Sequence, residues 1–414
     1  MANSLLTIDM ITREAVRLFK NSNLFIMNID TQYDNAFAQD GAKIGSTLRI
    51  RLPNDYVPTR GPAMQLQDTT EQWTTLTVTD QVNIAVPFTT AERTMDLDDY
   101  AERIMAPLIN NLAGEVAATV MSGASNNVCN FVSNVDASGT TGVAATGNII
   151  SPVSTQFLLA NSAIDNNSGD MMNRRVVNSP DTDARTTVSL QGLLNPTPEI
   201  SAQFRSGMMK SGLGYEKWFR DQTVIVHTAG TFSAGGTVNG GDQTGSTITV
   251  NAITGTLKQG DIVTFAAVNS VNRVTKRSQG KLRQFVVTAD VANGATSIPI
   301  YPALTPAVGG VAVQYQTVDA SPLNGAAMIL ATRASEVYYR SIAFTQKAIT
   351  MATADLVIPR KAVEEAARAE YDGISMRVLT DYLPNSDQLA TRVDVLFGQK
   401  YIRPEWLCIV ADKI

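Results

Sequence analysis

The chain has 414 residues, of which 44% are hydrophobic and 17% are charged, and its formal net charge is −5. This composition is that of a globular protein with ample material for a core, and it excludes a disordered chain. The length predicts about two to three domains. Clustered Lys and Arg are needed to neutralise DNA phosphates, so the acidic balance argues against a protein that holds DNA tightly.

The two cysteines, Cys129 and Cys408, are far apart in the sequence and have no CxxC partner. We therefore expect neither a zinc site nor a disulfide framework, and a reducing compartment is the simplest interpretation. The N-terminal segment lacks a basic leader, and Asp9 interrupts its apolar run, so it does not match a secretory signal. No apolar run reaches the roughly 18 residues that a membrane span needs. We expect a soluble protein that is made in the cytoplasm and has no membrane partner.

The first predicted element is a short amphipathic helix that Ser4 can cap. Its apolar residues recur at helical spacing, and they are Ile8, Ile11, Ala15, Leu18 and Phe19. The segment therefore predicts a helical N-terminal arm.

Two runs of alternating polarity then predict a long β-hairpin. The run from Thr47 to Pro53 alternates apolar and basic residues. The run TLTVTDQVNIAVPF, from Thr75 to Phe88, alternates over an unusual length and is interrupted only by Asp80. About twenty residues connect the two runs, and a connection of that length usually has a function. Because such a hairpin is not readily buried within one domain, we expect something outside the subunit to cover it.

A long helix is predicted from Asp96, a candidate N-cap, to about Ser122, because apolar residues recur there mostly every four positions. Pro107 lies inside this pattern and removes one backbone hydrogen bond, so we predict a bent helix or two helices in series. A further helix is predicted from Val153 to about Asn166. The run RRVVNSP that follows it resembles a buried strand.

From about Ala229 to Asp319 the composition shifts to Gly, Thr, Val and Ala. Turn residues separate five strand-length runs, STITV, DIVTFAAV, LRQFVVT, TSIPIY and VAVQY, which predict a small β barrel or sandwich of about ninety residues. This region interrupts an α/β pattern and ends near Leu323, as an inserted domain does when its two ends lie close together. Alternating strands close the chain, and the fold class expected from the whole pattern is α+β.

No catalytic constellation is recognisable in the sequence. His227 is the one histidine, and no nucleophile signature lies near it, so we interpret it as a structural residue at a domain junction. The segment GAKIGST at Gly41 has the wrong spacing for a phosphate-binding loop. Glu364 and Glu365 lie in KAVEEAARAE, which resembles a solvated helix face. We therefore expect no catalytic residue, no cofactor and no metal, in a protein that is not an enzyme.

Two weaker features have structural interpretations. The run DNNSGD at Asp165 resembles a calcium loop only in part, because Val176 occupies the position where the closing Glu belongs, and we expect a polar turn. Methionines come in two adjacent pairs, Met171 with Met172 and Met208 with Met209. Adjacent residues do not share a helix face, so we expect these methionines to fill the core.

The order of these parts resembles the major capsid proteins of tailed double-stranded DNA bacteriophages, specifically the coat proteins of short-tailed phages that carry an inserted β-barrel domain. Three segments carry the resemblance: WFRDQTVIVHTAGT, GTLKQGDIVTFAAVNSVNRVTKRSQGKLRQFVV and RVLTDYLPNSDQLATRVDVLFGQKYIRPEW. They look like the start of the inserted domain, its core and the closing strands of the family. The implied fold is that of the Hong Kong ninety-seven phage capsid protein.

The resemblance also implies a division of the chain. The arm would reach a neighbour, the hairpin would lie across the adjacent subunit, and the long helix would be a spine helix. The implied parts are an N-terminal arm (1–46), an extended hairpin loop (47–90), a peripheral domain with the spine helix (91–152), the first part of an axial domain (153–228), an inserted β-barrel domain (229–320), and a return through the axial and peripheral domains with the closing strands (321–414).

The implied function is structural. The protein would self-assemble into the icosahedral shell that encloses the viral double-stranded DNA, by way of a scaffolded procapsid that expands on maturation. Its implied partners are copies of itself in pentameric and hexameric capsomers, a scaffolding protein, a portal protein at one vertex, and packaged DNA that it contacts weakly and non-specifically. It would be found in the virion after assembly in the host bacterial cytoplasm. Near the hairpin tip, Arg60, Met64 and Trp73 are candidate intersubunit contacts.

Two other classes of function remain open. The first is another virion component, such as a tail or decoration protein built from similar β modules, against which the long helix and the α/β region argue. The second is a glycan-processing enzyme that uses carboxylates alone. Such an enzyme needs exposed aromatic residues grouped around its carboxylates, whereas aromatic residues are only 7% of this chain and are dispersed.

Overall fold

The computed structural model has a mixed α+β fold, as predicted. It describes residues 8–33, 47–59, 61–62, 64, 66–89, 106–134, 153–190, 211–359, 363, 365–371, 373–384 and 388–414. The chain divides into two units, and it passes between them repeatedly. Unit 1 comprises residues 1–52, 73–120 and 349–402, and unit 2 comprises residues 53–72, 121–348 and 403–414.

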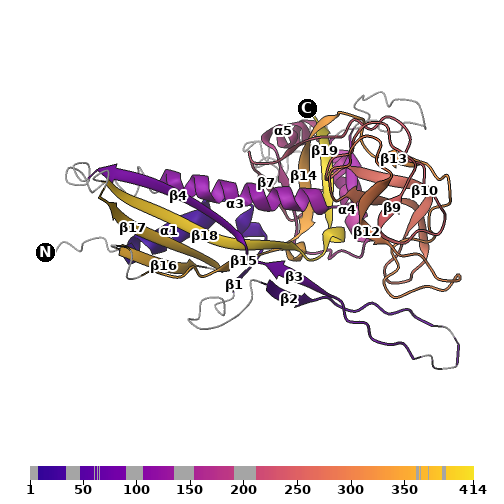
Figure 1. The fold of residues 1–414 in the computed structure, drawn as a ribbon, viewed down its shortest axis with the longest axis horizontal. Helices are drawn as coiled ribbons and strands as arrows, with labels where there is room; N and C mark the ends of the chain where they lie inside the picture. The colour runs from indigo at the N-terminus through magenta and orange to yellow at the C-terminus, as the bar shows by residue number, and fades with distance from the viewer. Residues whose placement is uncertain are drawn as a thin grey trace. The chain divides into compact units, whose positions relative to one another are not determined.

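Unit 1 is built on a six-stranded sheet whose central strand is β18 (Gln388–Tyr401). This strand pairs antiparallel with β4, β15 and β17, and Figure 1 shows β4, β18 and β17 as long strands that run together. Val393, Val395 and Phe397 are buried at alternate positions of β18, as expected for a strand with one face on a core. The other strands are β1 (Asp30–Tyr33), β4 (Asp80–Thr89), β15 (Ile349–Ala354), β16 (Glu365–Tyr371) and β17 (Ile374–Leu383). The predicted closing strands are therefore confirmed.

The N-terminal helix α1 (Ile8–Ser22) packs against β16 and β17 of the same unit. Ala15, Val16 and Phe19 are buried in this contact. The predicted amphipathic helix is confirmed, and its apolar side is covered by its own chain. The expectation that the N-terminal arm reaches a neighbour stays a prediction. A short 3-10 turn, η1 (Ile26–Asn28), follows it.

The segment KAVEEAARAE does not form the helix that we predicted. Glu365–Tyr371 is strand β16, which pairs antiparallel with β17 along its whole length. Ala, Glu and Arg favour helices intrinsically, but this preference is weak, and pairing with β17 together with packing under α1 overrides it. Glu365 is exposed, and Glu364 lies outside the described residues.

The predicted hairpin is present, but it is shorter than expected. Strand β2 (Thr47–Arg51) pairs antiparallel with β3 (Trp73–Thr77). The alternating run predicted as one long strand is two strands, because the chain turns after β3 and β4 then pairs with β18 instead of β2. The chain passes close to β18 at this turn, since a Cβ atom on Gly398 would overlap the carbonyl oxygen of Thr77. Asp80, which interrupts the sequence pattern, is the first residue of β4.

The long helix α3 (Ala106–Asn127) is confirmed and continues past its predicted end at Ser122. Pro107 is the second residue of the described helix. The predicted start at Asp96 falls on residues 90–105, outside the described residues, so the bent helix or two helices in series stays a prediction.

Unit 2 contains a second six-stranded sheet in the order β5-β19-β14-β6-β7, with β8 also paired to β14. Helix α4 (Val153–Asn166) packs on this sheet through Val153, Phe157, Ala160 and Ile164, which recur at helical spacing. The helix predicted at this position is confirmed, and so is the fully buried strand β6. The strands are β5 (Phe131–Ser133), β6 (Arg174–Asn178), β7 (Lys217–Arg220), β8 (Val226–Thr228), β14 (Val337–Thr345) and β19 (Leu407–Lys413). The remaining short elements are α5 (Pro180–Ser189), η5 (Gln346–Ala348) and η6 (Pro404–Trp406).

A five-stranded sheet in the order β13-β10-β11-β12-β9 follows β8 in the chain. It has its own hydrophobic core, in which Phe265, Phe285 and Ile298 are buried. The strands are β9 (Gly245–Thr249), β10 (Ile262–Val271), β11 (Ser278–Val287), β12 (Ser297–Leu304) and β13 (Met328–Leu330). Four of the five predicted strands are confirmed.

The fifth strand of this sheet was predicted wrongly. The run VAVQY (311–315) forms no strand, because Val308 and Val311 pair across Gly309 and Gly310, which both have positive φ and make a tight turn. Strand β13 takes the place beside β10 instead, although it lies past the predicted end of the domain at residue 320. A short segment, 237–239, hydrogen-bonds to Thr249 and Asn251 next to β9 and also to Gly325 and Ala326 near β13, so it links the two edges of the sheet.

Candidate contact surfaces

The loop between β2 and β3, residues 53–72, presents apolar side chains at its tip. Of the three predicted contact residues, Met64 lies there and is 85% exposed. Leu66 is 87% exposed beside it and was missed, although two apolar residues at alternate positions of an extended segment share one side. Arg60 lies outside the described residues. Large apolar side chains that are this exposed indicate a surface that another chain covers.

Trp73 lies at the other end of this loop, where β3 begins. It is half-exposed, and the Arg49 guanidinium carbon is 4.2 Å from its ring centroid. This cation–π contact holds the indole against β2. Trp73 is therefore held by its own strand pair in unit 1, whereas Met64 belongs to unit 2.

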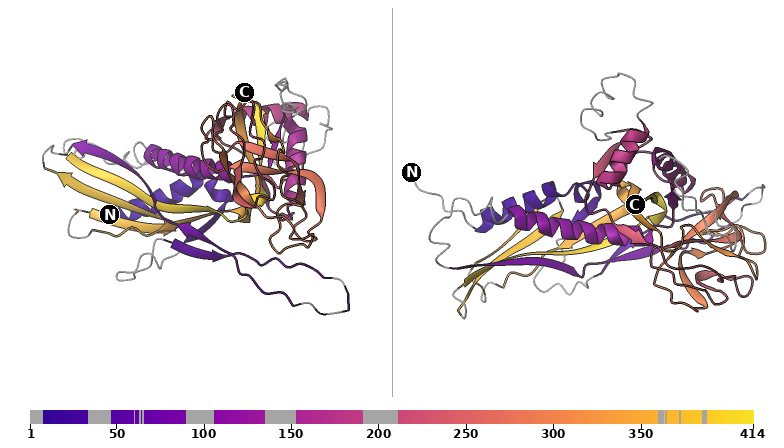
Figure 2. Two further views of the ribbon diagram at one scale, coloured as in Figure 1. Left: turned by 45° about the vertical axis from the view of Figure 1, so that its right-hand side comes forward. Right: turned by 90° about the horizontal axis from the view of Figure 1, so that it is seen from above.

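Hydrogen bonds within the chain hold the loop, which Figure 2 shows as a long connection between β2 and β3. The Gln67 side chain bonds both backbone groups of Val57, which joins the two arms of the loop. Tyr315 Oη donates to the Thr70 carbonyl at 2.7 Å, and Gln314 Nε2 donates to the Asp68 carbonyl at 2.9 Å. The backbone carbonyls of Asp68 and Thr70 are therefore satisfied within the chain. The expectation that something outside the subunit covers the hairpin stays a prediction.

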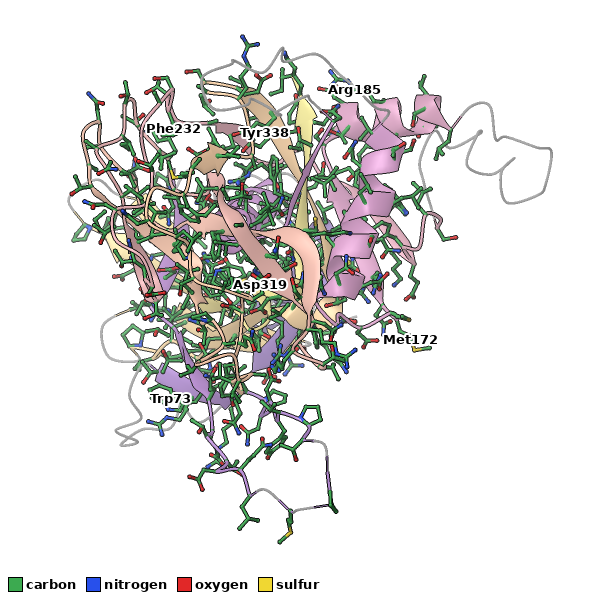
Figure 3. All side chains as sticks on the ribbon, turned by 90° about the vertical axis from the view of Figure 1, so that its right-hand side faces the viewer. Trp73, Met172, Arg185, Phe232, Asp319 and Tyr338 are labelled. Atoms are coloured by element: carbon green, nitrogen blue, oxygen red, sulfur yellow. The ribbon has the colours of Figure 1, made fainter. Side chains whose placement is uncertain are left out.

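A second apolar surface follows helix α4. Met171 and Met172 are 79% and 73% exposed in the turn between α4 and β6, and Figure 3 shows Met172 at the surface. The prediction that this pair fills the core is wrong, because both side chains lie in the turn that precedes β6 and are exposed to solvent there. Met208 and Met209 lie outside the described residues. Leu158 and Leu159 on the outer side of α4 are about half-exposed as well.

His227 joins two segments of unit 2. Its Nε2 atom lies 2.8 Å from Oδ1 of Asp261, which is fully buried. The other carboxylate oxygen accepts hydrogen bonds from the backbone N–H groups of Gly230 and Lys258. Burial lowers the pKa of His227, and the hydrogen bond to the Asp261 carboxylate opposes this shift in part. These contacts fit the predicted structural role.

The described residues contain no group of three or more His, Cys, Asp or Glu side chains that could hold a metal ion. Cys129 and Cys408 are buried free thiols. Burial raises the pKa of Cys129 to about 11, which leaves it protonated at neutral pH and a poor nucleophile. The run at Asp165 is a polar turn, as predicted, in which the carboxylate of Asp165 pairs with Arg174. Among the described helices, none has the length and apolar character that crossing a lipid bilayer requires.

Taken together, these side chains form contact surfaces rather than a reaction centre. The chain is a member of the family described as P22 coat protein, gene protein 5, whose family model matches residues 3–410. The resemblance seen in the sequence is thereby confirmed.

This membership defines the protein as a major capsid protein of a tailed phage, a structural component of the virion and not an enzyme. Many copies associate into the capsomers of the icosahedral shell. The tail-component and glycan-enzyme alternatives are set aside, because the family match extends over nearly the whole chain.

Solved phage structures are also similar to this chain. The capsid of the cyanophage P-SCSP1u is 10% identical, with a TM-score of 0.46 over 94% of this chain and 88% of that one. The capsid of Ralstonia phage GP4 is 9% identical, with a TM-score of 0.45 over 92% and 87%. Mycobacterium phage Che8 is 9% identical, with a TM-score of 0.43 over 89% and 85%. No curated protein matches the chain.

Proposed function

We propose that this coat protein first assembles into a precursor shell with the help of a scaffolding protein, and that the shell expands as DNA is packaged. Its capsomers are pentamers and hexamers, a portal protein occupies one vertex, and assembly takes place in the host bacterial cytoplasm. Arg60, Met64 and Trp73 remain the proposed intersubunit contacts, and Leu66 joins them.

The observation that carries this proposal is the exposed apolar tip of the loop at residues 53–72. Fully burying a Met or Leu side chain contributes about 1.5–3 kcal/mol. One such contact cannot hold two subunits together, but a subunit in a shell makes several contacts at once, and their effects combine through multivalency. Weak individual contacts also permit the rearrangement that expansion requires.

We propose that the hairpin loop lies across the adjacent subunit and that the region after β8 is an inserted domain. Its separate hydrophobic core and the segment that links its two sheet edges support this assignment. The proposed domain runs from residue 229 through β13 and so ends at about residue 330 instead of 320. The other predicted divisions of the chain are kept.

We propose that packaged DNA touches the inner side of the shell only weakly and without sequence preference. The net charge of −5 supports this, because tight binding requires the neutralisation of many phosphates by Lys and Arg. Weak contact leaves the DNA free to be packed and released.

The test is size-exclusion chromatography with negative-stain electron microscopy on the purified chain, with and without a co-expressed scaffolding protein. Closed shells of uniform size that appear only with the scaffolding protein are the expected result. Closed shells of the same size and yield without it would remove the scaffolding step. A small oligomer under both conditions would contradict assembly as proposed.

A further inference from the structure

A group of buried and partly buried cations in unit 2 surrounds one carboxylate of the loop at residues 53–72. Lys276, in the turn between β10 and β11, has a side chain that is only 1% exposed, and its Nζ atom lies 3.3 Å from Oδ2 of Asp55. Arg273 Nε in the same turn lies 3.1 Å from each oxygen of Asp55. Asp55 belongs to the first arm of the loop, and its side chain is 17% exposed. The contact is therefore mostly shielded from water.

Arg403 adds a third positive charge to this group. It is 9% exposed, and its pKa is lowered first by burial and then by the charge of Arg273, while Asp55 acts in the opposite direction. Glu405 is the other carboxylate of the group, and it accepts a hydrogen bond from Tyr301. Without Asp55, three cations would share one carboxylate in a site from which water is largely excluded, which is strongly unfavourable.

We propose that Asp55 is a latch residue, which fixes the loop at residues 53–72 to the β10–β11 turn of its own subunit and so holds the tip ready to bind a neighbouring copy. This inference rests on the proposed function of the tip in intersubunit contact. A loop that is ordered before binding loses less conformational entropy when it binds, so the latch speeds assembly without itself touching the neighbour.

Asp55 is the natural residue to test, because the hydrogen bonds that Tyr315 and Gln314 make to the loop end on backbone carbonyls. Tyr315 and Gln314 hold the second arm through Thr70 and Asp68, and no side-chain substitution in the loop removes those acceptors. Replacing Asp55 with Asn keeps the size of the side chain and removes the charge that the cations need. Asp68→Asn is a matched control, since it removes the same charge from an exposed side chain of the same loop.

Trypsin reports on the loop directly, because Arg60 is the sole Lys or Arg between residues 53 and 72. Unassembled subunits are treated with trypsin, and the rate of cleavage after Arg60 is followed by mass spectrometry, with circular dichroism to check the fold. We expect Asp55→Asn to be cleaved about tenfold faster than the wild type, the change that the loss of a charge-assisted pair produces in a local opening equilibrium. Asp68→Asn is cleaved at the wild-type rate.

A second variant keeps the test decisive if Asp55→Asn folds poorly. Arg273→Gln removes the bidentate partner from the other side and should raise the cleavage rate similarly. Combining the two changes should then add little, because both remove one interaction. Equal cleavage rates for wild type, Asp55→Asn and Arg273→Gln overturn the latch.

The same variants are then mixed with scaffolding protein, and shell formation is followed by light scattering. The latch predicts slower shell growth for Asp55→Asn and normal growth for Asp68→Asn. Normal growth of an Asp55→Asn protein whose loop is cleaved faster overturns the role in assembly. If the wild type itself forms no shells, the proposed function has failed, and that failure is distinct because the cleavage comparison uses unassembled subunits.

Discussion

His227 and Asp261 lie 34 positions apart in the chain and meet where β8 leads toward the five-stranded sheet. The buried carboxylate has three hydrogen-bonding partners, His227 and the N–H groups of Gly230 and Lys258. Because two of these donors belong to the backbone, the carboxylate keeps most of its stabilisation whether or not the imidazole is protonated. Burial, which disfavours the imidazolium, then dominates the pKa of His227.

We therefore predict that His227 titrates with a midpoint below 6.5 in the folded subunit. The unfolded chain takes up this proton near pH 6.5 and the folded chain does not, so the free energy of unfolding falls as the pH drops below about 6.5. Since the chain has one histidine, its labelled imidazole gives a single NMR signal that can be followed with pH. His227→Gln should lose this part of the pH dependence in urea unfolding. A midpoint at or above 6.5 contradicts the prediction.

At the scale of elements, close packing against strand β18 requires a glycine at one of its positions. The chain passes β18 closely where β3 ends, and Gly398 provides the space, because a Cβ atom there would overlap Thr77 and approach the Cα atom of Val78. Gly114 in helix α3 is different, since nothing lies within 4 Å of the position of its Cβ atom. Close packing therefore requires the glycine at position 398, whereas the site of Gly114 has room for a side chain.

Gly398→Ala should destabilise the subunit by about 1–3 kcal/mol, the usual cost of inserting a methyl group into a packed site. Gly114→Ala is the matched control, and it should stabilise the subunit by up to about 1 kcal/mol, because Ala favours the helix and the site has room. Urea denaturation of unassembled subunits measures both. The idea fails if both variants unfold at the wild-type midpoint.

Elements whose pattern is local could be predicted from the sequence. The apolar spacing of α4, the buried run of β6 and four strands of the inserted region follow from periodicity within a few residues. The errors arise where the secondary structure is determined by pairing with a strand that is distant in the sequence. Pairing with β17 makes KAVEEAARAE a strand, and pairing with β18 divides the run from Thr75 to Phe88 into β3 and β4. Neither partner is visible in the local sequence.

The residues of the contact surfaces could likewise be predicted where the signal is local, and could not be predicted where it depends on a distant partner. Met64 could be predicted because it lies in a long connection, and Leu66 shares its alternation. The pairing of Asp55 with Arg273 could not be predicted, because these residues are 218 positions apart and neither stands out in its own segment. The exposure of Met171 and Met172 depends on where α4 ends, a boundary that periodicity alone does not fix.

At the scale of the whole molecule, assembly depends on contacts that repeat in every subunit. A change that weakens one interface slightly is repeated across the shell, so shell formation responds more steeply than the binding of two subunits does. Met64 and Leu66 at the tip of the loop are the most exposed large apolar side chains among the described residues. Substitutions there should therefore affect assembly strongly and folding little.

The last prediction concerns a variant that carries both Met64→Asp and Leu66→Asp. Both side chains are almost fully exposed, so the isolated subunit should keep its wild-type melting temperature. In the shell, each new carboxylate would be taken out of water without a partner, which costs more than the lost apolar contact alone. We expect the yield of closed shells, counted by electron microscopy, to fall at least about tenfold. Thr69→Asp combined with Gln72→Asp adds the same charge to exposed positions away from the tip and should assemble normally. Normal yield for the tip variant would place the intersubunit contact elsewhere, and equal losses for both variants would point to the charge of the loop and not to its apolar tip.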